Sequence, residues 1–191
     1  LLDDRTAEGS DKQLHSIAHG VISLEQLAPE YGAERRRLRV TKFRGTSYRG
    51  GYHDFRIARG GIQVFPRLIA NEHSQPFTRA QIQSGVPRLD ALLGGGPHRG
   101  TSTLLMGPAG CGKSTIALRY ACTAAQSGEK AAVYTFDESL ATLIERATGL
   151  GLDPRPLIHS GRLHVEQIDP AELSPGEFIS RIRGLVDDQH L

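Results

Sequence analysis

Tryptophan is absent from this 191-residue sequence, and its two cysteines, Cys111 and Cys122, form no C-x-x-C pair. A disulfide framework is therefore not expected, and so little cysteine is typical of a reducing compartment. No apolar run approaches the roughly 18 residues that a membrane-spanning helix needs, and the first residues lack the layout of a signal peptide. Neither H-E-x-x-H nor G-x-S-x-G occurs, so neither a zinc site nor a serine hydrolase is predicted. We expect a soluble, cytoplasmic protein without a membrane partner.

Excess charge of either sign is also small, because the formal net charge is +2. The positive charge is nevertheless concentrated between Glu30 and Arg67, where ten Lys or Arg residues stand against three acids. Such a block binds nucleic acid in some proteins. It is equally typical of a solvated strand face, or of a surface that meets phosphates or acids on a neighbour. Nucleic acid is therefore kept as a partner to test and is not the favoured one.

The first 67 residues have the pattern of short strands. Apolar residues recur in the runs 21–27, 38–43, 55–57 and 62–64, and in the last two they alternate with polar ones. Arg59, Gly60 and Gly61 lie between the last two runs, where glycine supplies the positive φ of a tight hairpin turn. The pattern predicts a small antiparallel β region, which needs a helix or another sheet to cover it.

After a predicted linker at residues 68–83, the pattern changes to alternating strands and helices. Strands are expected at 102–106, 131–136 and 162–168. Helices are expected from the glycine-rich turn to about residue 125, from the capping residue Ser139, and from Ser174, which begins a capping box with Glu177 and has Pro175 at the first helical position. This order predicts an α/β fold with a parallel sheet and flanking helices. The last helix has no strand after it, so we expect a fragment of the domain.

The strongest motif lies between the first of these strands and its helix. Residues 107–114, Gly-Pro-Ala-Gly-Cys-Gly-Lys-Ser, fit the P-loop pattern G-x-x-x-x-G-K-[ST]. Glycine lets the backbone wrap a phosphate with its N–H groups pointing inward, Lys113 supplies a cation for the β- and γ-phosphates, and the Ser114 hydroxyl is suited to ligate Mg²⁺. The helix dipole adds to this attraction. The sequence therefore predicts ATP and Mg²⁺ as cofactors, bound by Gly107, Pro108, Ala109, Gly110, Cys111, Gly112, Lys113, Ser114 and Thr115.

Two acids follow the second predicted strand, Asp137 and Glu138. Acids at the tip of a strand beside a P-loop are placed to orient a water or to hold the magnesium shell. Three interpretations stay open at this point. The strand is the metal-holding Walker B strand, or it carries the general base while Walker B comes later, or the two acids only stabilise the start of the helix near Ser139.

Two longer segments carry a resemblance to a known family. Residues 84–96, Ser-Gly-Val-Pro-Arg-Leu-Asp-Ala-Leu-Leu-Gly-Gly-Gly, and the P-loop region 99–115 resemble the opening of a KaiC-type, RecA-like P-loop ATPase domain. Segments 16–24, 36–47 and 61–65 resemble the closing strands of such a domain. The resemblance implies a junction between tandem domains. Residues 1–67 would end the first domain, 68–83 would link the two, and 84–191 would begin the second, with Walker B missing.

The same resemblance implies roles for particular residues. It favours Asp137 or Glu138 as the general base, beside the catalytic Lys113. Lys42 and Arg44 match a "K-x-R-G" strand whose cations reach the nucleotide of a neighbouring subunit. Residues i and i+2 of a strand project to the same side, and such cations can neutralise transition-state charge. The family position of the general base usually holds glutamate, so Asp137 implies slow hydrolysis. A homo-hexameric ring and serine/threonine autokinase activity of the intact protein are further implications.

Two alternatives belong to other functional classes. One is a nucleic-acid-dependent RecA-like ATPase, which the basic block at residues 30–67 suggests. Its test is salt-sensitive DNA binding that stimulates hydrolysis. The other is a non-catalytic, ATP-gated assembly module, which predicts oligomerisation on ATP binding without turnover.

Overall fold

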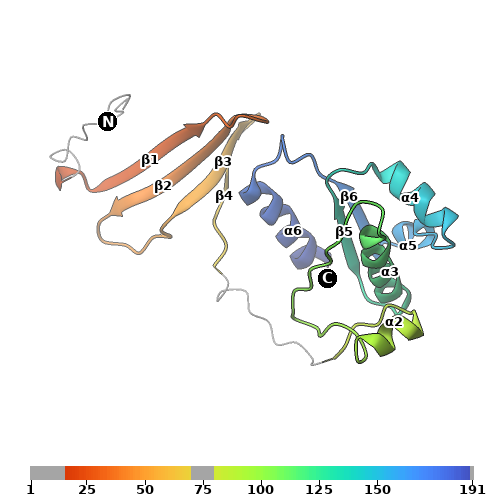
Figure 1. Ribbon diagram of the computed structural model, residues 1–191. Helices are drawn as coiled ribbons and strands as arrows, with labels where there is room; N and C mark the ends of the chain where they lie inside the picture. Colours follow the sequence, from red (N-terminus) through yellow and green to blue (C-terminus); the bar gives the residue numbers. More distant parts are fainter. Residues whose placement is uncertain (1–15, 70–79, 190–191) are drawn as a thin grey trace. The chain divides into compact units, whose positions relative to one another are not determined.

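The computed structural model describes residues 16–69 and 80–189 (Figure 1). Contacts divide the chain into two units. The first contains the residues up to Leu68 together with Ala171–Arg181, and the second contains Ile69–Pro170 and the residues from Ile182 on. Most of the predicted linker, and the first 15 residues of the predicted β region, lie outside the described residues.

The first unit contains one antiparallel sheet of four strands in the order β1-β2-β3-β4. They are β1 (Gly20–Leu27), β2 (Arg35–Phe43), β3 (Tyr52–Ala58) and β4 (Gly61–Phe65). The predicted antiparallel region is thereby confirmed. Ala58 pairs with Gly61 across the β3–β4 turn, and Gly60 has a φ of 103° there. This left-handed conformation is the one that glycine adopts without steric cost.

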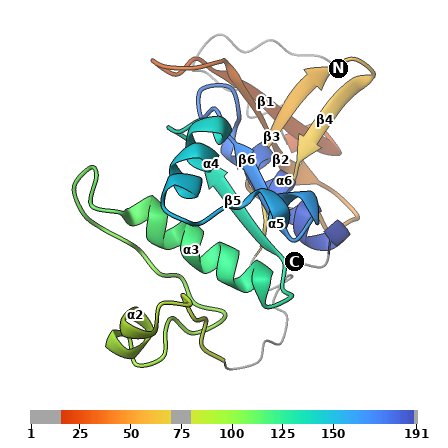
Figure 2. The ribbon, with the colours of Figure 1, turned by 90° about the vertical axis from the view of Figure 1, so that its right-hand side faces the viewer.

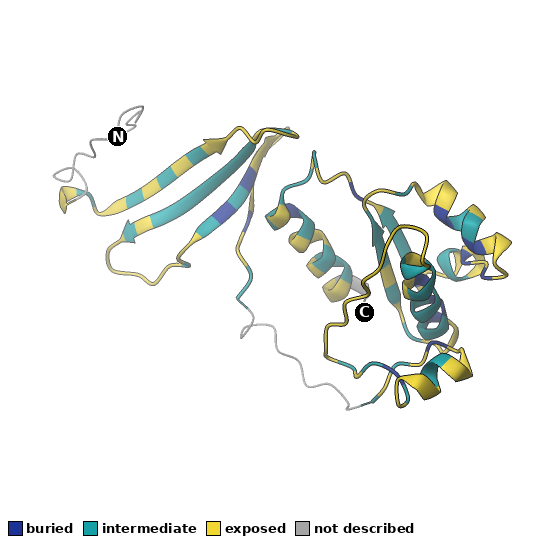
Figure 3. Cartoon of the chain, in the orientation of Figure 1, coloured by how far each residue is buried: buried dark blue, intermediate teal, exposed yellow. Residues whose placement is uncertain are grey.

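Strand register gives this sheet an apolar face. Cross-strand partners such as Ile22 with Val40 and Ile57 with Ile62 lie on the same side, because side chains alternate along each strand. Ile22, Ile57 and Ile62 are exposed, and Figure 3 shows exposed residues recurring along β1. The sheet therefore forms without burying much of its apolar face.

Helix α6 (Pro175–Gln189) begins in the first unit. The Ser174 hydroxyl accepts a hydrogen bond from the Glu177 N–H at 3.1 Å, which confirms the predicted N-cap. The reciprocal half of the capping box does not form, because the Glu177 carboxylate accepts from Arg56 at 2.5 Å and from Arg181 at 3.4 Å. A long-range ion pair thus replaces the local contact.

The second unit is built around two parallel strands, β5 (Ala131–Thr135) and β6 (Leu163–Gln167). Helices α3 (Lys113–Gln126) and α4 (Leu140–Gly149) pack against them, and α3 lies beside β5 in both Figure 1 and Figure 2. Their facing residues make one buried apolar cluster. Its members are Leu118, Cys122, Ala125, Leu143, Ala147, Leu152 and Leu163. These strands and helices confirm most of the predicted alternation.

One predicted strand is wrong. Residues 102–106 have no regular structure, and Figure 1 draws them as a loop that leads into α3. Leu104 and Met106 are 80% and 83% exposed. An isolated strand has no ladder to satisfy its backbone groups, and within the described ranges no segment pairs with this one. The α/β class is confirmed, but the parallel sheet has only two strands.

Two short helices were not predicted, α2 (Pro87–Leu92) and α5 (Arg155–His159). Both have proline in their first turn, where its missing N–H costs nothing. Among the helices of the described part of the chain, none combines the length and the apolar character that crossing a membrane requires.

Candidate functional site

The predicted P-loop stands directly before α3. Gly110 and Gly112 have φ angles of 79° and 93°, and Gly112 is the N-cap of the helix. A Cβ on Gly107 would lie 2.6 Å from the Cys111 sulfur, so a side chain there would require the Cys111 side chain to move. At Gly110 and Gly112 the positive φ itself favours glycine, which lets the chain turn tightly at the start of a 14-residue helix.

The start of α3 presents backbone donors to this loop. The first N–H groups of a helix have no partner within the helix, and no side chain of the described residues caps them here. The first turn also contains no acid that would repel an anion. In α4, by contrast, the Ser139 hydroxyl accepts from the Thr142 N–H at 3.1 Å. Of the two helices, α3 is therefore the one that offers its N-terminus to an anion.

The Lys113 side chain folds back onto the P-loop. Its Nζ donates to the carbonyl oxygens of Gly107 and Pro108, both at 2.8 Å, and lies 3.9 Å from the Cys111 sulfur. The ammonium group thus lies where the loop's own carbonyls converge. These residues fit a nucleotide phosphate and its Mg²⁺: a cation at the loop, uncapped N–H groups, and the exposed hydroxyl-bearing Ser114.

The two acids after β5 have different surroundings. Asp137 is exposed, and none of the described residues gives its carboxylate a hydrogen bond or an ion pair. Glu138 is held by Arg146 of α4 through two bonds, Nε to Oε1 and Nη2 to Oε2, each of 2.9 Å. Because these bonds stabilise the ionised carboxylate, they hold the pKa of Glu138 below its ordinary value. Glu138 is committed to Arg146, whereas Asp137 is open to solvent.

Arg146 also reaches the P-loop helix. Its Nη1 donates to the Thr115 hydroxyl at 2.9 Å, so one guanidinium joins the end of β5 to the first turn of α3. Arg146 was not among the site residues predicted from the sequence. A signal was present in the spacing, because Arg146 lies seven residues after Ser139, two helical turns from the start of α4.

A second set of contacts ties the segment before the loop to α3. The backbone N–H and the hydroxyl of Ser84 donate to Asp90 at 2.8 and 2.7 Å, and these bonds lower the pKa of Asp90. The Ser84 carbonyl accepts from Arg119 at 3.1 Å and from Thr123 at 2.8 Å. Ser84 has no exposed surface. The bonds from Arg119 and Thr123 hold the start of the 84–96 segment against α3.

Lys42 and Arg44 lie in the other unit, at the end of β2. Both side chains donate to the carbonyl oxygen of Ser16, at 3.0 and 2.8 Å. Partial desolvation and the nearby Arg44 charge lower the pKa of Lys42. The two cations therefore project to the same side, as their i, i+2 spacing predicts.

Two further arginines of the basic block, Arg37 and Arg39, contact the Tyr52 ring. Arg37 makes a 2.6 Å ion pair with Glu25, and its guanidinium lies 4.0 Å from the centre of the Tyr52 ring. Arg39 stacks over the same ring at 4.9 Å. The pair with Glu25 neutralises the charge of Arg37, whereas the buried Nε of Arg39 has no hydrogen-bond partner among the described residues.

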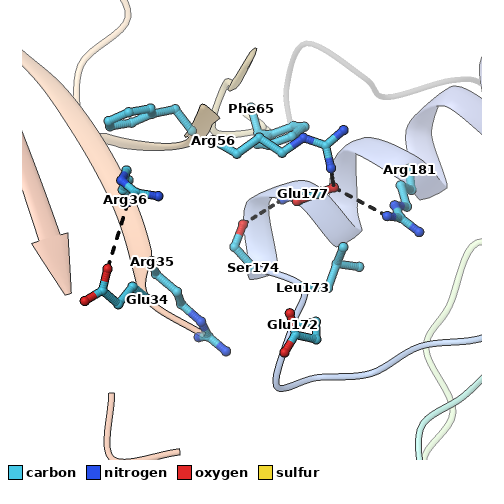
Figure 4. Close-up of a pocket in the computed structure, with 11 residues that line it drawn as sticks. Glu34, Arg35, Arg36, Arg56, Phe65, Glu172, Leu173, Ser174, Glu177 and Arg181 are labelled. Carbon is cyan, nitrogen blue, oxygen red and sulfur yellow. Dashed lines mark hydrogen bonds and ion pairs between the residues drawn. The ribbon is translucent and has the colours of Figure 1, made fainter. Parts of the chain in front are cut away.

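The first unit also contains a hollow of about 290 Å³ beside the start of α6 (Figure 4). Glu177, only 7% exposed, lies between Arg56 and Arg181, and the Arg36 guanidinium lies 3.9 Å from Glu34. The lining carboxylates Glu177 and Glu34 are thus engaged in ion pairs with lining arginines. The P-loop therefore remains the stronger candidate site.

Comparison with known proteins shows a family relationship. A family model described as "ATPase: KaiC" matches residues 82–182. The circadian clock oscillator protein KaiC of Acaryochloris marina is 34% identical over 149 residues, covering 78% of this chain and 28% of that protein. The KaiC of Synechococcus elongatus is 30% identical over 172 residues, covering 90% and 33%. The circadian clock protein KaiC2 of a Synechocystis strain is 33% identical over 174 residues, covering 86% and 30%. The chain spans about a third of the length of these curated relatives.

Proposed function

This chain belongs to the KaiC family of ATPases, and from that premise we propose that it binds Mg-ATP at residues 107–115 and contributes to slow ATP hydrolysis. One observation carries the proposal. The glycine loop at the uncapped start of α3 holds the Lys113 ammonium group against the Gly107 and Pro108 carbonyls. A cation, free N–H donors and a hydroxyl thus meet at one helix end.

Each residue of the loop has a defined task in this proposal. Backbone N–H groups of the loop and of the first helical turn bind phosphate oxygens. Lys113 exchanges its two carbonyl partners for phosphate, and Ser114 ligates Mg²⁺. Mg-ATP supplies, when bound, the phosphoryl group that is transferred to water.

The acids after β5 supply the base. The exposed Asp137 orients the attacking water and accepts its proton. Glu138 stays ionised in its pair with Arg146 and adds negative charge beside that base. Aspartate is one methylene shorter than the glutamate usual at this position of the family, which is why we propose slow turnover.

Properties of the whole protein are proposed from the family. Residues 1–67 end one KaiC-like domain, 68–83 link it to the next, and 84–191 begin the second. The intact protein forms a hexameric ring, in which Lys42 and Arg44 act on nucleotide bound by a neighbouring subunit. Their convergence on one carbonyl oxygen supports a shared anionic target. Serine/threonine autophosphorylation is a second proposed activity of the intact protein.

Mg-ATP binding by this chain, measured by isothermal titration calorimetry, tests the central proposal. Lys113→Ala should weaken binding at least about tenfold, because it removes the cation that meets the phosphates. Lys130→Ala is the matched control: it removes a lysine just after α3, outside the loop. Circular dichroism should show that all three proteins fold. A folded wild-type chain without ATP binding would contradict the proposal.

The assembly-module alternative is tested separately in the intact protein. ATP-dependent oligomerisation without release of phosphate would favour it over hydrolysis. The ion pair of Arg37 with Glu25 neutralises one cation of the basic block, which gives the nucleic-acid alternative less support.

A further inference from the structure

Arg146 makes a hydrogen bond to Thr115 in addition to its ion pair with Glu138. Its guanidinium uses one edge for the two bonds to Glu138 and its remaining nitrogen for the Thr115 hydroxyl. Glu138 stands directly after the exposed Asp137, and Thr115 directly follows Ser114. One planar side chain thus connects the acids at the end of β5 with the P-loop helix.

The turn that carries these acids is held from the other side as well. The Thr135 hydroxyl donates to the Glu138 carbonyl oxygen at 2.7 Å. The backbone of Glu138 is therefore fixed to β5 and its carboxylate to α4. With Glu138 held at both ends, the direction in which the neighbouring Asp137 projects is restricted too.

A second arginine–carboxylate pair in the same unit, with two hydrogen bonds between the partners, provides a comparison. Arg155 binds Asp153 through Nε at 2.8 Å and Nη2 at 2.9 Å, but within the described ranges its guanidinium bonds no other residue. The side chains of Arg155 and Asp153 are 61% and 39% exposed, against 33% and 25% for Arg146 and Glu138. The Arg146 pair is more shielded, and it alone bridges two elements of the candidate site.

We propose that Arg146 is a positioning residue of the ATPase site, which fixes the end of β5 against the first turn of α3 and leaves Asp137 as the carboxylate that faces the reaction. This inference rests on the proposed ATPase function and adds to it a residue outside the P-loop. Arg146 touches neither nucleotide nor water in this role, and it acts through Glu138 and Thr115.

The nucleotide-free chain provides the first test. Amide hydrogen exchange at residues 117–119, whose N–H groups bond to the carbonyls of the first turn of α3, should accelerate about fivefold in Arg146→Met, the factor that corresponds to one lost hydrogen bond. Arg155→Met, which breaks a forked pair with no bond to α3, should leave those amides unchanged. Equal exchange in Arg146→Met and wild type would overturn the bridge.

Hydrolysis by the intact protein provides the second test. Arg146→Met should lower kcat about tenfold through misplacement of the base, with the KM for ATP within about threefold of wild type. Arg146→Lys should not restore kcat, because an ammonium group cannot make the fork to Glu138 and also reach Thr115. Combining Arg146→Met with Glu138→Gln should cost no more than the worse single change, because the two residues act as a unit.

The outcomes separate the two proposals. A wild-type intact protein that does not hydrolyse ATP contradicts the proposed function itself. Normal wild-type hydrolysis with an unchanged kcat in Arg146→Met, or full activity in Arg146→Lys, contradicts only the positioning role.

Discussion

The two units are stabilised in different ways. The second buries a continuous apolar cluster of helix and strand residues, with Leu118 and Leu143 at 1% and 2% exposure. The first has a complete hydrogen-bonded sheet, yet Leu24 and Ile57 on its apolar face are both 64% exposed. Its buried residues are Phe55 and Phe65 together with the polar His53 and Glu177. Strand pairing and ion pairs thus define a sheet that has only a small apolar core, and its open apolar face favours a covering layer.

The largest expected effect tests whether the second unit holds the larger apolar core. Leu143→Ala should cost about 2–5 kcal/mol of unfolding free energy, because it leaves a cavity in the cluster. Leu24→Ala, the same change on the open sheet face, should cost less than about 1 kcal/mol. Urea unfolding measures both. Equal losses would mean that the apolar face of the sheet is covered in solution.

The next largest effect concerns the buried carboxylate of Glu177 in the first unit. Glu177→Gln removes the charge shared by Arg56 and Arg181 and should cost about 1–3 kcal/mol, since it weakens bonds to charged groups at a buried site. Asp187→Asn breaks the exposed pair with Arg183 and should cost less than about 0.5 kcal/mol. Urea unfolding compares the two variants, and similar losses would refute a special role for the buried carboxylate.

Helix caps allow a like-for-like comparison between α4 and α6. Ser139 and Ser174 each accept the N–H of the residue three positions later, both at 3.1 Å. Alanine at either position should cost about 1 kcal/mol and accelerate amide exchange in the first turn of its own helix. Faster exchange in α4 after Ser174→Ala would show that the two helix starts are coupled.

The smallest expected effect is a dependence on pH that both units share. The Tyr52 hydroxyl and then Arg37 lower the pKa of Glu25, and the Arg146 hydrogen bonds lower the pKa of Glu138. Each carboxylate therefore stabilises the fold above the ordinary value of 4.5, and this contribution disappears as the pH falls through the lower folded pKa. Because both side chains are partly exposed, each contribution should stay below about 1 kcal/mol.

Carboxyl NMR titration tests this dependence. In Tyr52→Phe the midpoint of Glu25 should rise toward its ordinary value, while that of Glu138 stays in place. In Arg146→Met the opposite pattern is expected. A midpoint of Glu25 that does not respond to Tyr52→Phe would contradict the assigned cause.

Local patterns predicted the parts of the fold that neighbouring residues determine. The caps at Ser139 and Ser174, the hairpin at Gly60 and the helix after Gly112 each follow from residues within one turn of one another. Strand 102–106 did not form, because a strand depends on a partner that its own sequence does not specify. Apolar residues alone could not distinguish a paired strand from an exposed loop.

The same distinction between local patterns and contacts of distant residues applies to the candidate site. The P-loop residues are consecutive, so their pattern was visible in the sequence, whereas the contacts of Lys113 with the loop carbonyls were not predicted. The bridge from Arg146 to Thr115 joins residues 31 positions apart, and it depends on how α4 packs beside α3. The roles of Asp137, Glu138, Lys42 and Arg44 remain predictions that hydrolysis measurements will decide.

The contacts of Lys113 have a consequence for ligand choice. Because its ammonium group already has two carbonyl partners, binding at this loop is an exchange of ligands, and only an acceptor stronger than a neutral carbonyl gains from it. Adenosine, which has no phosphate, offers no such acceptor, whereas pyrophosphate does. The two carbonyl oxygens therefore compete with any ligand for the lysine and set a threshold of negative charge, so the loop should select for the polyphosphate before the base is recognised at all.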